Sequence, residues 1–290
     1  MKKAFKVVIG LVLLVIVAVG GVITVASINY SKHASIKHEV PELDISAEMK
    51  TADLETGKRI VTVRNGCFDC HGTDLAGATI INDGPAGLIA GANITPYKLA
   101  DWSDSEIARA IRYGVGKDGM PLVFMPSTEL QNLSKQDLAS LVAYLRTVPK
   151  VEKENVEVQP GPIMKIMHLF GKIPHLLSVE NVDRSAHFPD KPAEGPTPEF
   201  GKYLVTAACT GCHGSNLAGG PIAGGPPEWP PAADLRGSAM GKWTQEQFIK
   251  AMREGVNPSG AKIRLPMPIE MTKALSDNEL IAMYSYLKGV

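Results

Sequence analysis

The hydrophobic pattern of the chain opens with one long apolar segment. No charged residue occurs between Val7 and Ile28, and these 22 residues span roughly 33 Å as a helix, which matches a bilayer core. Cleaved signal peptides usually have a shorter apolar stretch of about 7–15 residues. We therefore predict a cytoplasmic tip and transmembrane anchor over residues 1–28, with a cleaved signal peptide as the alternative.

Positive charge precedes this segment at Lys2, Lys3 and Lys6. Because lysines that flank a membrane span stay in the cytoplasm, we expect a single-pass protein of the cytoplasmic (inner) membrane with its remainder on the periplasmic side. Both interpretations of the apolar segment export the chain. Residues 29–50 are then predicted to be a polar tether that leads out of the membrane.

Helical periodicity dominates the rest of the chain, and strand alternation is not convincing anywhere, so the predicted class is all-α. Helix starts are marked by capping boxes, in which side chains satisfy the free N–H groups of the first turn. The pairs are Ser103 with Glu106, Thr244 with Gln247, Ser276 with Glu279 and, in a weaker form, Ser134 with Asp137. Amphipathic helices follow Ser134 and Ser276, and further helices are expected to begin near Ala52 and Glu199.

The two halves of the chain align with an offset of 141–142 residues, which indicates a duplicated domain. Domain 1 is predicted at residues 51–150 and domain 2 at residues 196–290. Matching pairs include Trp102 with Trp243, Arg112 with Arg253, Met125-Pro126 with Met267-Pro268, and Leu133-Ser134 with Leu275-Ser276.

Residues 151–195 form the predicted connector between the domains. Its apolar residues lie roughly at helical spacing, which favours a strap packed on a domain; an interfacial membrane segment is the alternative. These residues are Ile163, Met167, Phe170, Ile173 and Leu177. Prolines from Pro189 to Pro198 predict an extended entry to domain 2.

Composition and charge change this picture little. The chain is 44% hydrophobic and 21% charged, and its formal net charge is zero. These values are typical of a globular protein and argue against a basic nucleic-acid-binding surface.

All four cysteines of the chain lie in two Cys-x-x-Cys-His motifs. The motif predicts covalent attachment of a c-type haem, with both cysteines in thioethers and the histidine as iron ligand. A thioredoxin-like site lacks its βαβ context, and the two motifs are too far apart for one zinc site. We therefore predict two covalently bound haem c groups, held by Cys67, Cys70 and His71 and by Cys209, Cys212 and His213.

A sixth iron ligand is predicted from matched spacing. Met125 follows Cys67 by 58 residues, and Met267 follows Cys209 by the same distance. Thioether sulfur is a soft ligand, and Met/His ligation raises the haem potential. The predicted iron ligands are therefore His71 with Met125 and His213 with Met267, while Met120 and Met271 are local alternatives.

The Cys-x-x-Cys-His motifs, Asn93-Ile94-Thr95-Pro96, the Met-Pro pairs and the final Leu-Ser helices resemble the class I cytochrome c family, in its tandem dihaem, membrane-anchored form. The resemblance covers about residues 51–150 and 199–290 and implies two cytochrome c-like domains. In domain 2, Ala232–Leu235 stands where Asn-Ile-Thr-Pro is expected, which leaves that loop less certain.

The resemblance also suggests further residues around the haems. A proline carbonyl accepts the N–H of the proximal histidine in this family, and Pro85 and Pro227 are the candidates. Arg112 and Arg253 are candidate partners of the propionates, with a solvated helix face as the alternative. Trp102 and Trp243 are expected in the core, and surface or packing roles are expected for His33, His38, His168, His175 and His187.

Two irons that are each closed by His and Met favour electron transfer over catalysis. We predict an electron carrier with no catalytic residues, which relays single electrons between a membrane or periplasmic donor and an acceptor. Its expected partners are redox proteins: a dehydrogenase, a quinol-oxidising complex, an oxidase or a soluble cytochrome. The alternatives are a fixed cytochrome subunit of a dehydrogenase or terminal oxidase complex and a dihaem peroxidase or thiosulfate dehydrogenase-like enzyme.

Overall fold

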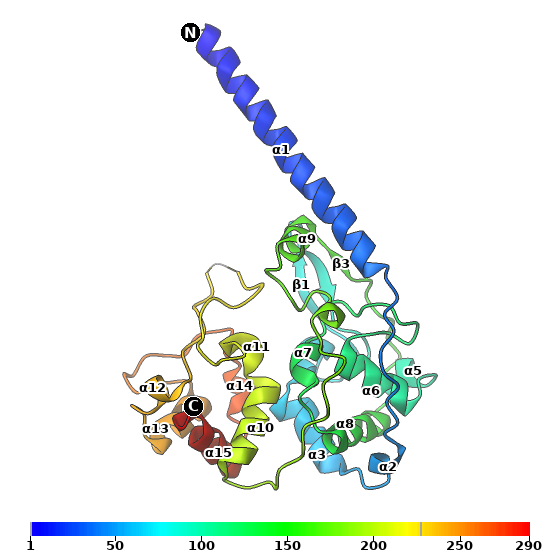
Figure 1. Ribbon diagram of the computed structural model, residues 1–290, viewed down its shortest axis with the longest axis vertical. Coiled ribbons are helices and arrows are strands. Elements are labelled where there is room, and N and C mark those ends of the chain that lie inside the picture. Colours follow the sequence, from blue (N-terminus) through cyan, green and yellow to red (C-terminus); the bar gives the residue numbers. More distant parts are fainter. Residues whose placement is uncertain (1, 227) are drawn as a thin grey trace.

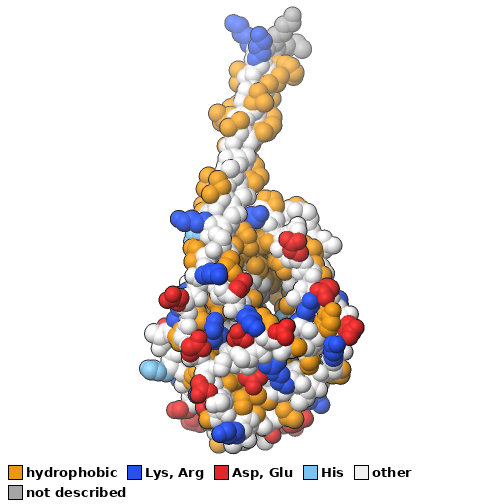
Figure 2. Space-filling model, turned by 90° about the vertical axis from the view of Figure 1, so that its right-hand side faces the viewer, with side chains coloured by type: hydrophobic (Ala, Val, Ile, Leu, Met, Phe, Trp, Pro, Cys, Tyr) orange, Lys and Arg blue, Asp and Glu red, His pale blue; other side chains and the backbone are white. Residues whose placement is uncertain are grey.

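Two helical domains lie side by side, and one long helix projects from the first of them (Figure 1). The computed structural model describes residues 2–226 and 228–290. The long helix, α1, spans Lys2–Ala34 and is long and apolar enough to cross a membrane. Hydrophobic side chains cover it along most of its length, and lysines lie near its tip (Figure 2).

The remaining elements follow the predicted duplication. Domain 1 contains α2 (Ser46–Met49), α3 (Leu54–Arg59), the π-helix η1 (Ile60–Arg64), α4 (Cys67–His71), β1 (Thr79–Asp83), β2 (Gly87–Ala90), α5 (Pro96–Leu99), α6 (Asp104–Tyr113), α7 (Ser127–Leu130) and α8 (Lys135–Thr147). The connector holds β3 (Gln159–Pro160), α9 (Pro162–Leu169) and the 3₁₀ turn η2 (Ser178–Glu180). Domain 2 contains α10 (Pro198–Ala208), α11 (Thr210–His213), α12 (Gly237–Met240), α13 (Gln245–Glu254), α14 (Ile269–Thr272) and α15 (Asp277–Lys288).

Three of the predicted capping boxes are present. The boxes at α6, α13 and α15 have both of their reciprocal hydrogen bonds, with Ser103, Thr244 and Ser276 as the N-cap residues. At α8 the Ser134 hydroxyl accepts from the Asp137 N–H, but Asp137 does not return a bond to the Ser134 N–H. Instead, the Ser134 N–H donates to the Tyr203 hydroxyl of domain 2, so this cap is completed across the domain interface.

Each domain packs the helix that leads toward its haem motif against its last helix at a glycine. Gly57 of α3 faces the main chain of α8 at Ser140, and Gly201 of α10 faces the main chain of α15 at Ala282. A Cβ at either glycine would overlap the facing carbonyl oxygen. The absence of a side chain therefore allows the helix backbones to touch, and a separate hydrophobic core forms around each crossing.

A small sheet was not predicted from the sequence. Strands β1 and β2 form an antiparallel hairpin, and β3 from the connector pairs antiparallel with β2. The strands are short, and β1 is mostly exposed, so they lack the alternation of a half-buried strand. The protein is still mainly helical, as predicted.

The connector packs on domain 1, as the strap interpretation requires. Ile173 and Leu177 are buried beside Met164 of α9 and Tyr30 of α1 in a third hydrophobic cluster. Ile163 and Phe170, in contrast, are exposed. The segment predicted as a polar tether, residues 29–50, also differs from expectation, because α1 continues beyond residue 28 and Leu43 and Ile45 are buried in the core of domain 1.

The domain interface is built from equivalent positions of the two repeats. Asn65 and Ala207 each lie two residues before the first cysteine of a haem motif, and the Asn65 side-chain amide donates to the Ala207 carbonyl at 2.9 Å. Arg64 of domain 1 pairs with Glu279 at the start of α15, and Tyr203 of α10 donates to Asp137 at the equivalent position of α8. An approximate two-fold axis therefore passes close to the start of both haem motifs.

Candidate haem sites

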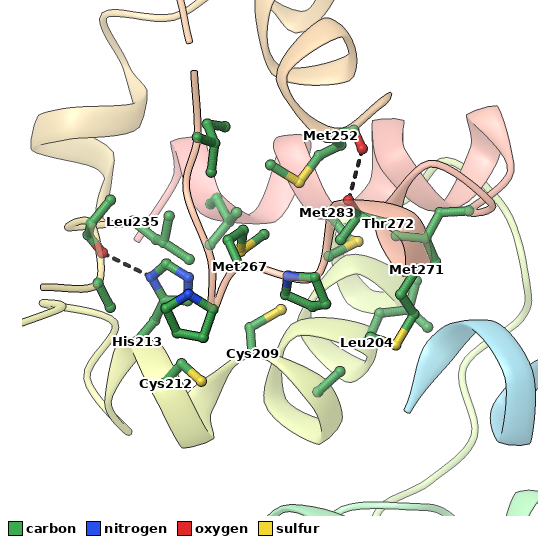
Figure 3. Close-up of a pocket in the computed structure, with 18 of the residues that line it drawn as sticks. Leu204, Cys209, Cys212, His213, Leu235, Met252, Met267, Met271, Thr272 and Met283 are labelled. Atoms are coloured by element: carbon green, nitrogen blue, oxygen red, sulfur yellow. Dashed lines mark hydrogen bonds between the residues drawn. The ribbon is translucent and has the colours of Figure 1, made fainter. Parts of the chain in front are cut away.

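In domain 2 the predicted ligands surround a cavity of about 440 Å³. Cys209, Cys212 and His213 come from the end of α10 and from α11, whereas Met267 comes from the loop before α14. Figure 3 shows the sulfur of Met267 beside the His213 ring, with Cys209 near both. Residues that lie far apart in the sequence are thus gathered around one apolar space.

The proximal histidines are oriented by main-chain carbonyls that follow each motif. His71 Nδ1 lies 2.7 Å from the Ala92 carbonyl, and His213 Nδ1 lies 2.8 Å from the Ala233 carbonyl. These bonds place the proton on Nδ1 and leave Nε2 free to bind a metal.

The predicted proline acceptors are therefore wrong for domain 1. The Pro85 carbonyl accepts from the Ile163 N–H in the connector, where it helps to hold the small sheet. Pro227 lies outside the described residues, but the His213 ring of its domain already has the Ala233 carbonyl as partner. The prolines were expected from the family resemblance, and a main-chain acceptor carries no residue-type signal that would have pointed to Ala92 instead.

The turn that carries each acceptor carbonyl is stabilised by the side chain of the next residue. In domain 1, Asn93 Oδ1 accepts from the N–H and hydroxyl of Thr95, and its amide donates to two connector carbonyls. In domain 2, Asp234 accepts from the N–H of Arg236 in the same turn geometry. The sequence departure in domain 2 thus preserves the turn and its carbonyl, but it lacks the ties to the connector.

Burial shifts the pKa values of the histidine and of the first cysteine in both motifs. Burial lowers the pKa of His71 and of His213, although the carbonyl hydrogen bonds oppose the shift, so both rings are neutral at pH 7. Burial also raises the pKa of Cys67 and of Cys209 to about 12. Both thiols are therefore unlike the reactive thiolates of redox or zinc sites.

The observed donor set fits a haem in each domain. The fit rests on a neutral imidazole with a free Nε2, two cysteines within the adjoining turn and, in domain 2, an apolar cavity. Cys67, Cys70 and His71 would hold one haem c, and Cys209, Cys212 and His213 would hold the second. When bound, each haem accepts and releases one electron at its iron.

The candidate methionines lie differently in the two domains. Met125 packs against the core of domain 1, and its loop is tied to the connector. Phe124 N–H donates to the Leu176 carbonyl at 3.0 Å, and the Ser178 hydroxyl donates to the Met125 carbonyl. Among the described residues, the connector makes no such hydrogen bond to the Met267 loop, and the nearby Leu265 is 79% exposed.

Met271 lies at the opposite edge of the cavity from His213 and beside the ribbon of domain 1 (Figure 3). Its sulfur packs on Gly66, the residue before Cys67. At the equivalent place in the other repeat, Glu129 packs on Gly211 of the domain 2 motif. Each domain therefore lays one side chain on the haem-attachment turn of the other. Met271 also lines the cavity, so its role as an alternative ligand stays a prediction.

The two repeat arginines hold main-chain carbonyls. Arg112 is buried, and it donates to the carbonyls of Gln131 and Ala186 at 2.5 and 2.7 Å. Arg253 donates to the carbonyl of Lys273, the repeat equivalent of Gln131, and to Asp277. Both therefore tie the helix before the Met-Pro loop to the turn after it. Because Arg112 is buried, it does not belong to a solvated helix face, while a propionate contact of either arginine stays a prediction. Trp102 and Trp243 pack against the cores as expected.

Comparisons with known proteins agree with this geometry. The cytochrome c family model matches residues 54–149 and 199–290, which is more than half of the chain. The cytochrome c subunit of the quinone alcohol dehydrogenase from Gluconacetobacter polyoxogenes is 27% identical over 256 residues, which cover 77% of this chain and 53% of that protein. The gluconate 2-dehydrogenase cytochrome c subunit from Pantoea cypripedii is 28% identical over 266 residues, which cover 77% and 56%.

A longer protein is also similar. A nicotinate dehydrogenase subunit from Pseudomonas putida is 26% identical over 265 residues, which cover 82% of this chain and 21% of that protein. The chain thus spans about half the length of the two dehydrogenase cytochrome c subunits and a fifth of the nicotinate dehydrogenase protein. With two matched segments, each containing one complete haem-attachment motif, the chain belongs to the cytochrome c family and is an electron-transfer protein with two covalently bound haems.

Proposed function

We propose that this chain is the cytochrome subunit that takes electrons from a dehydrogenase and passes them to an acceptor at the membrane. The observation that carries the proposal is the similarity to dehydrogenase cytochrome subunits over 77% of the chain, across both haem domains. The chain itself supplies no catalytic residue in this proposal, because substrate oxidation belongs to the partner. The partner is inferred by its chemistry, a dehydrogenase that releases electrons one at a time.

The proposed axial ligands are Met125 and Met267. Their support is the equal spacing from each motif, the position of Met267 in the cavity with His213, and the packing of Met125 against the core of domain 1. Iron closed by His and Met keeps its ligands when its charge changes, which suits electron transfer. Spectra of the oxidised protein should show the long-wavelength Met–iron band, and Met125→Ala and Met267→Ala should each remove about half of it, since each iron contributes one Met ligand.

The proposed location is the cytoplasmic membrane, with both haem domains on the periplasmic side. Lys3 and Lys6 precede the apolar part of α1, and the lysine charge favours a cytoplasmic tip. Ala26 and Tyr30, near the other end of α1, are buried against the rest of the protein. A helix whose end belongs to the fold supports a retained anchor over a cleaved signal peptide.

The decisive experiment is purification of the full chain in mild detergent from its native membrane. A dehydrogenase should copurify, and its substrate should reduce both haems within the complex. A second candidate is a free carrier that serves several partners, and it rests on the proposed closing of both iron sites by Met125 and Met267. In that case the chain should migrate alone, and added dehydrogenase should reduce it only through transient encounters.

A further inference from the structure

Three side chains with metal-binding atoms converge where α1 meets the rest of the protein. They are His33 of α1, His168 of α9 and Glu180 of η2, and one donor atom from each lies within 4.8 Å of the others. His33 Nδ1 lies 2.5 Å from Glu180 Oε1, and His168 Nε2 lies 2.9 Å from Glu180 Oε2. Three separate segments of the chain thus aim ligand atoms at one point.

We propose that this cluster is a zinc site that fastens the foot of α1 to the connector. Two imidazole nitrogens and one carboxylate oxygen, with water as the fourth ligand, form a usual tetrahedral zinc set. A zinc ion with ligands at about 2.0–2.2 Å spaces its donor atoms roughly 3.3–3.5 Å apart. The observed 2.5 and 2.9 Å spacings reach that range through small side-chain rotations.

The surroundings of the cluster suit such an ion. The His168 side chain is 9% exposed, and the side chains of Glu180 and His33 are 22% and 37% exposed. The site is therefore buried on the His168 side and open to solvent on the His33 side. His168 Nδ1 is buried and has no hydrogen-bond partner among the described residues, so Nε2 makes all of the polar contacts of this ring. Tyr30 packs perpendicular to the His168 ring, at 5.9 Å between centroids, and restrains its orientation.

The nearby charges also fit an incoming cation. Glu180 is the anion of the cluster, and each imidazole offers zinc a neutral ring nitrogen. Lys165 lies over the Tyr30 ring, and the Arg184 guanidinium donates to His38 Nδ1. These cations have partners of their own, and neither makes a hydrogen bond to Glu180.

The cluster is linked through the main chain to the first haem domain. Two residues before Glu180, the Ser178 hydroxyl donates to the Met125 carbonyl. Leu177 pairs with Val123, and the Leu176 carbonyl accepts from the Phe124 N–H. A metal that fixes Glu180 therefore also holds the strap over the Met125 loop, a consequence that rests on the proposed function, whereas the metal site itself does not.

The test uses the full chain with both haems, in detergent, and zinc chloride as the probe. After equilibration and removal of unbound metal, elemental analysis should find one zinc for every two irons, and zinc should raise the unfolding temperature. X-ray absorption at the zinc edge should show nitrogen and oxygen ligands with the outer-shell scattering of two imidazoles.

The variants His33→Ala and Glu180→Gln should each lower zinc affinity at least tenfold. The exposed His187 provides the matched control, because His187→Ala should keep the wild-type stoichiometry. Wild-type protein that retains no zinc would overturn the proposal, and so would retention that is unchanged in both His33→Ala and Glu180→Gln. Copurification with a dehydrogenase is measured separately, so either proposal can fail without the other.

Discussion

Arg64, three residues before the first haem-attachment cysteine, donates from Nε to Glu279 of the last helix at 2.7 Å. Both side chains are almost fully buried, although one belongs to domain 1 and the other to domain 2. Arg64 also donates to Glu194 of the connector at 3.0 Å, and Arg59 forms a further ion pair with Glu279. This network holds the two haem domains in one arrangement.

The first prediction concerns the loss of this arginine. Arg64→Ala should lower the free energy of unfolding by about 3–5 kcal/mol, because it leaves Glu279 buried with one cation fewer. Denaturant unfolding followed by circular dichroism measures the change. Lys250→Ala, in an exposed pair with Glu254, is the control and should cost under about 0.5 kcal/mol. Equal effects of the two variants would contradict a structural role for the buried pair.

Acid should weaken the same interface. Burial alone would raise the pKa of Glu279, but hydrogen bonds from the Ser276 N–H and from Arg64, with the charges of Arg64 and Arg59, hold it below its ordinary value of 4.5. A carboxyl group with a lowered pKa in the folded state stabilises the protein above its unfolded pKa, and this stabilisation is lost as the pH falls through the folded pKa. The pH window therefore begins near 4.5 and extends downward.

The measurement is the difference in unfolding free energy between wild type and Glu279→Gln as a function of pH. Glutamine keeps the capping bond to Ser276 but cannot ionise. The difference should be largest at neutral pH and should shrink below pH 4.5. A difference that stays constant down to pH 3 would show that the ionisation of Glu279 contributes nothing.

The helix crossing in domain 2 should not tolerate a side chain at Gly201. Gly201→Ala places a methyl group on the Ala282 carbonyl, so α10 and α15 must separate, at a cost of about 1–3 kcal/mol or more. Thermal unfolding and the haem content of domain 2 report the damage. Gly195→Ala, where an added Cβ meets nothing within 4 Å, should leave both unchanged.

The two proposed methionine ligands should differ in strength of attachment. The connector holds the Met125 loop through Leu176 and Ser178, whereas the chain beside Met267 is exposed at Leu265. On heating, the Met–iron band of Met125→Ala, which reports Met267, should disappear before the band of Met267→Ala. Loss of both bands at the same temperature would show that the strap does not stabilise the Met125 bond.

Loosening Asn93 should alter one haem and not the other. Asn93→Ala removes two hydrogen bonds to the connector beside the Ala92 carbonyl that accepts from His71. A weaker bond to the ring makes the imidazole a poorer electron donor, so the potential of the domain 1 haem should rise. Potentiometry on the variant should show one shifted and one unshifted haem.

The features that could be predicted from the sequence are those that depend on the types of residues close together in the chain. Capping boxes, the two haem motifs and the repeat depend on side chains a few residues apart or on a fixed offset, so Ser103 and Ser276 could be assigned directly. The residue whose carbonyl accepts the His71 Nδ1 proton could not be predicted from the sequence. Every residue has a carbonyl, and only the folded loop places that of Ala92 beside the ring.

The sequence pattern also did not predict that the connector supports the Met125 loop of domain 1 but not the Met267 loop of domain 2. The connector residues Leu176 and Ser178 are far from Met125 in the chain, and nothing in their type marks them as its support. Arg64, Glu279 and Met271 raise the same difficulty, because their partners lie in the other repeat. The offset offered one usable signal, since Asn65 and Ala207 occupy equivalent positions and meet across the interface.

The unbroken course of α1 sets how far the haems can travel. The six residues between the apolar segment and the end of the helix at Ala34 rise only about 9 Å. The buried Tyr30 then fixes the helix to the body of the protein. With α1 as the proposed membrane anchor, the haem domains cannot move far from the membrane on a flexible linker. We therefore propose that both the donor and the acceptor present their redox centres close to the bilayer surface.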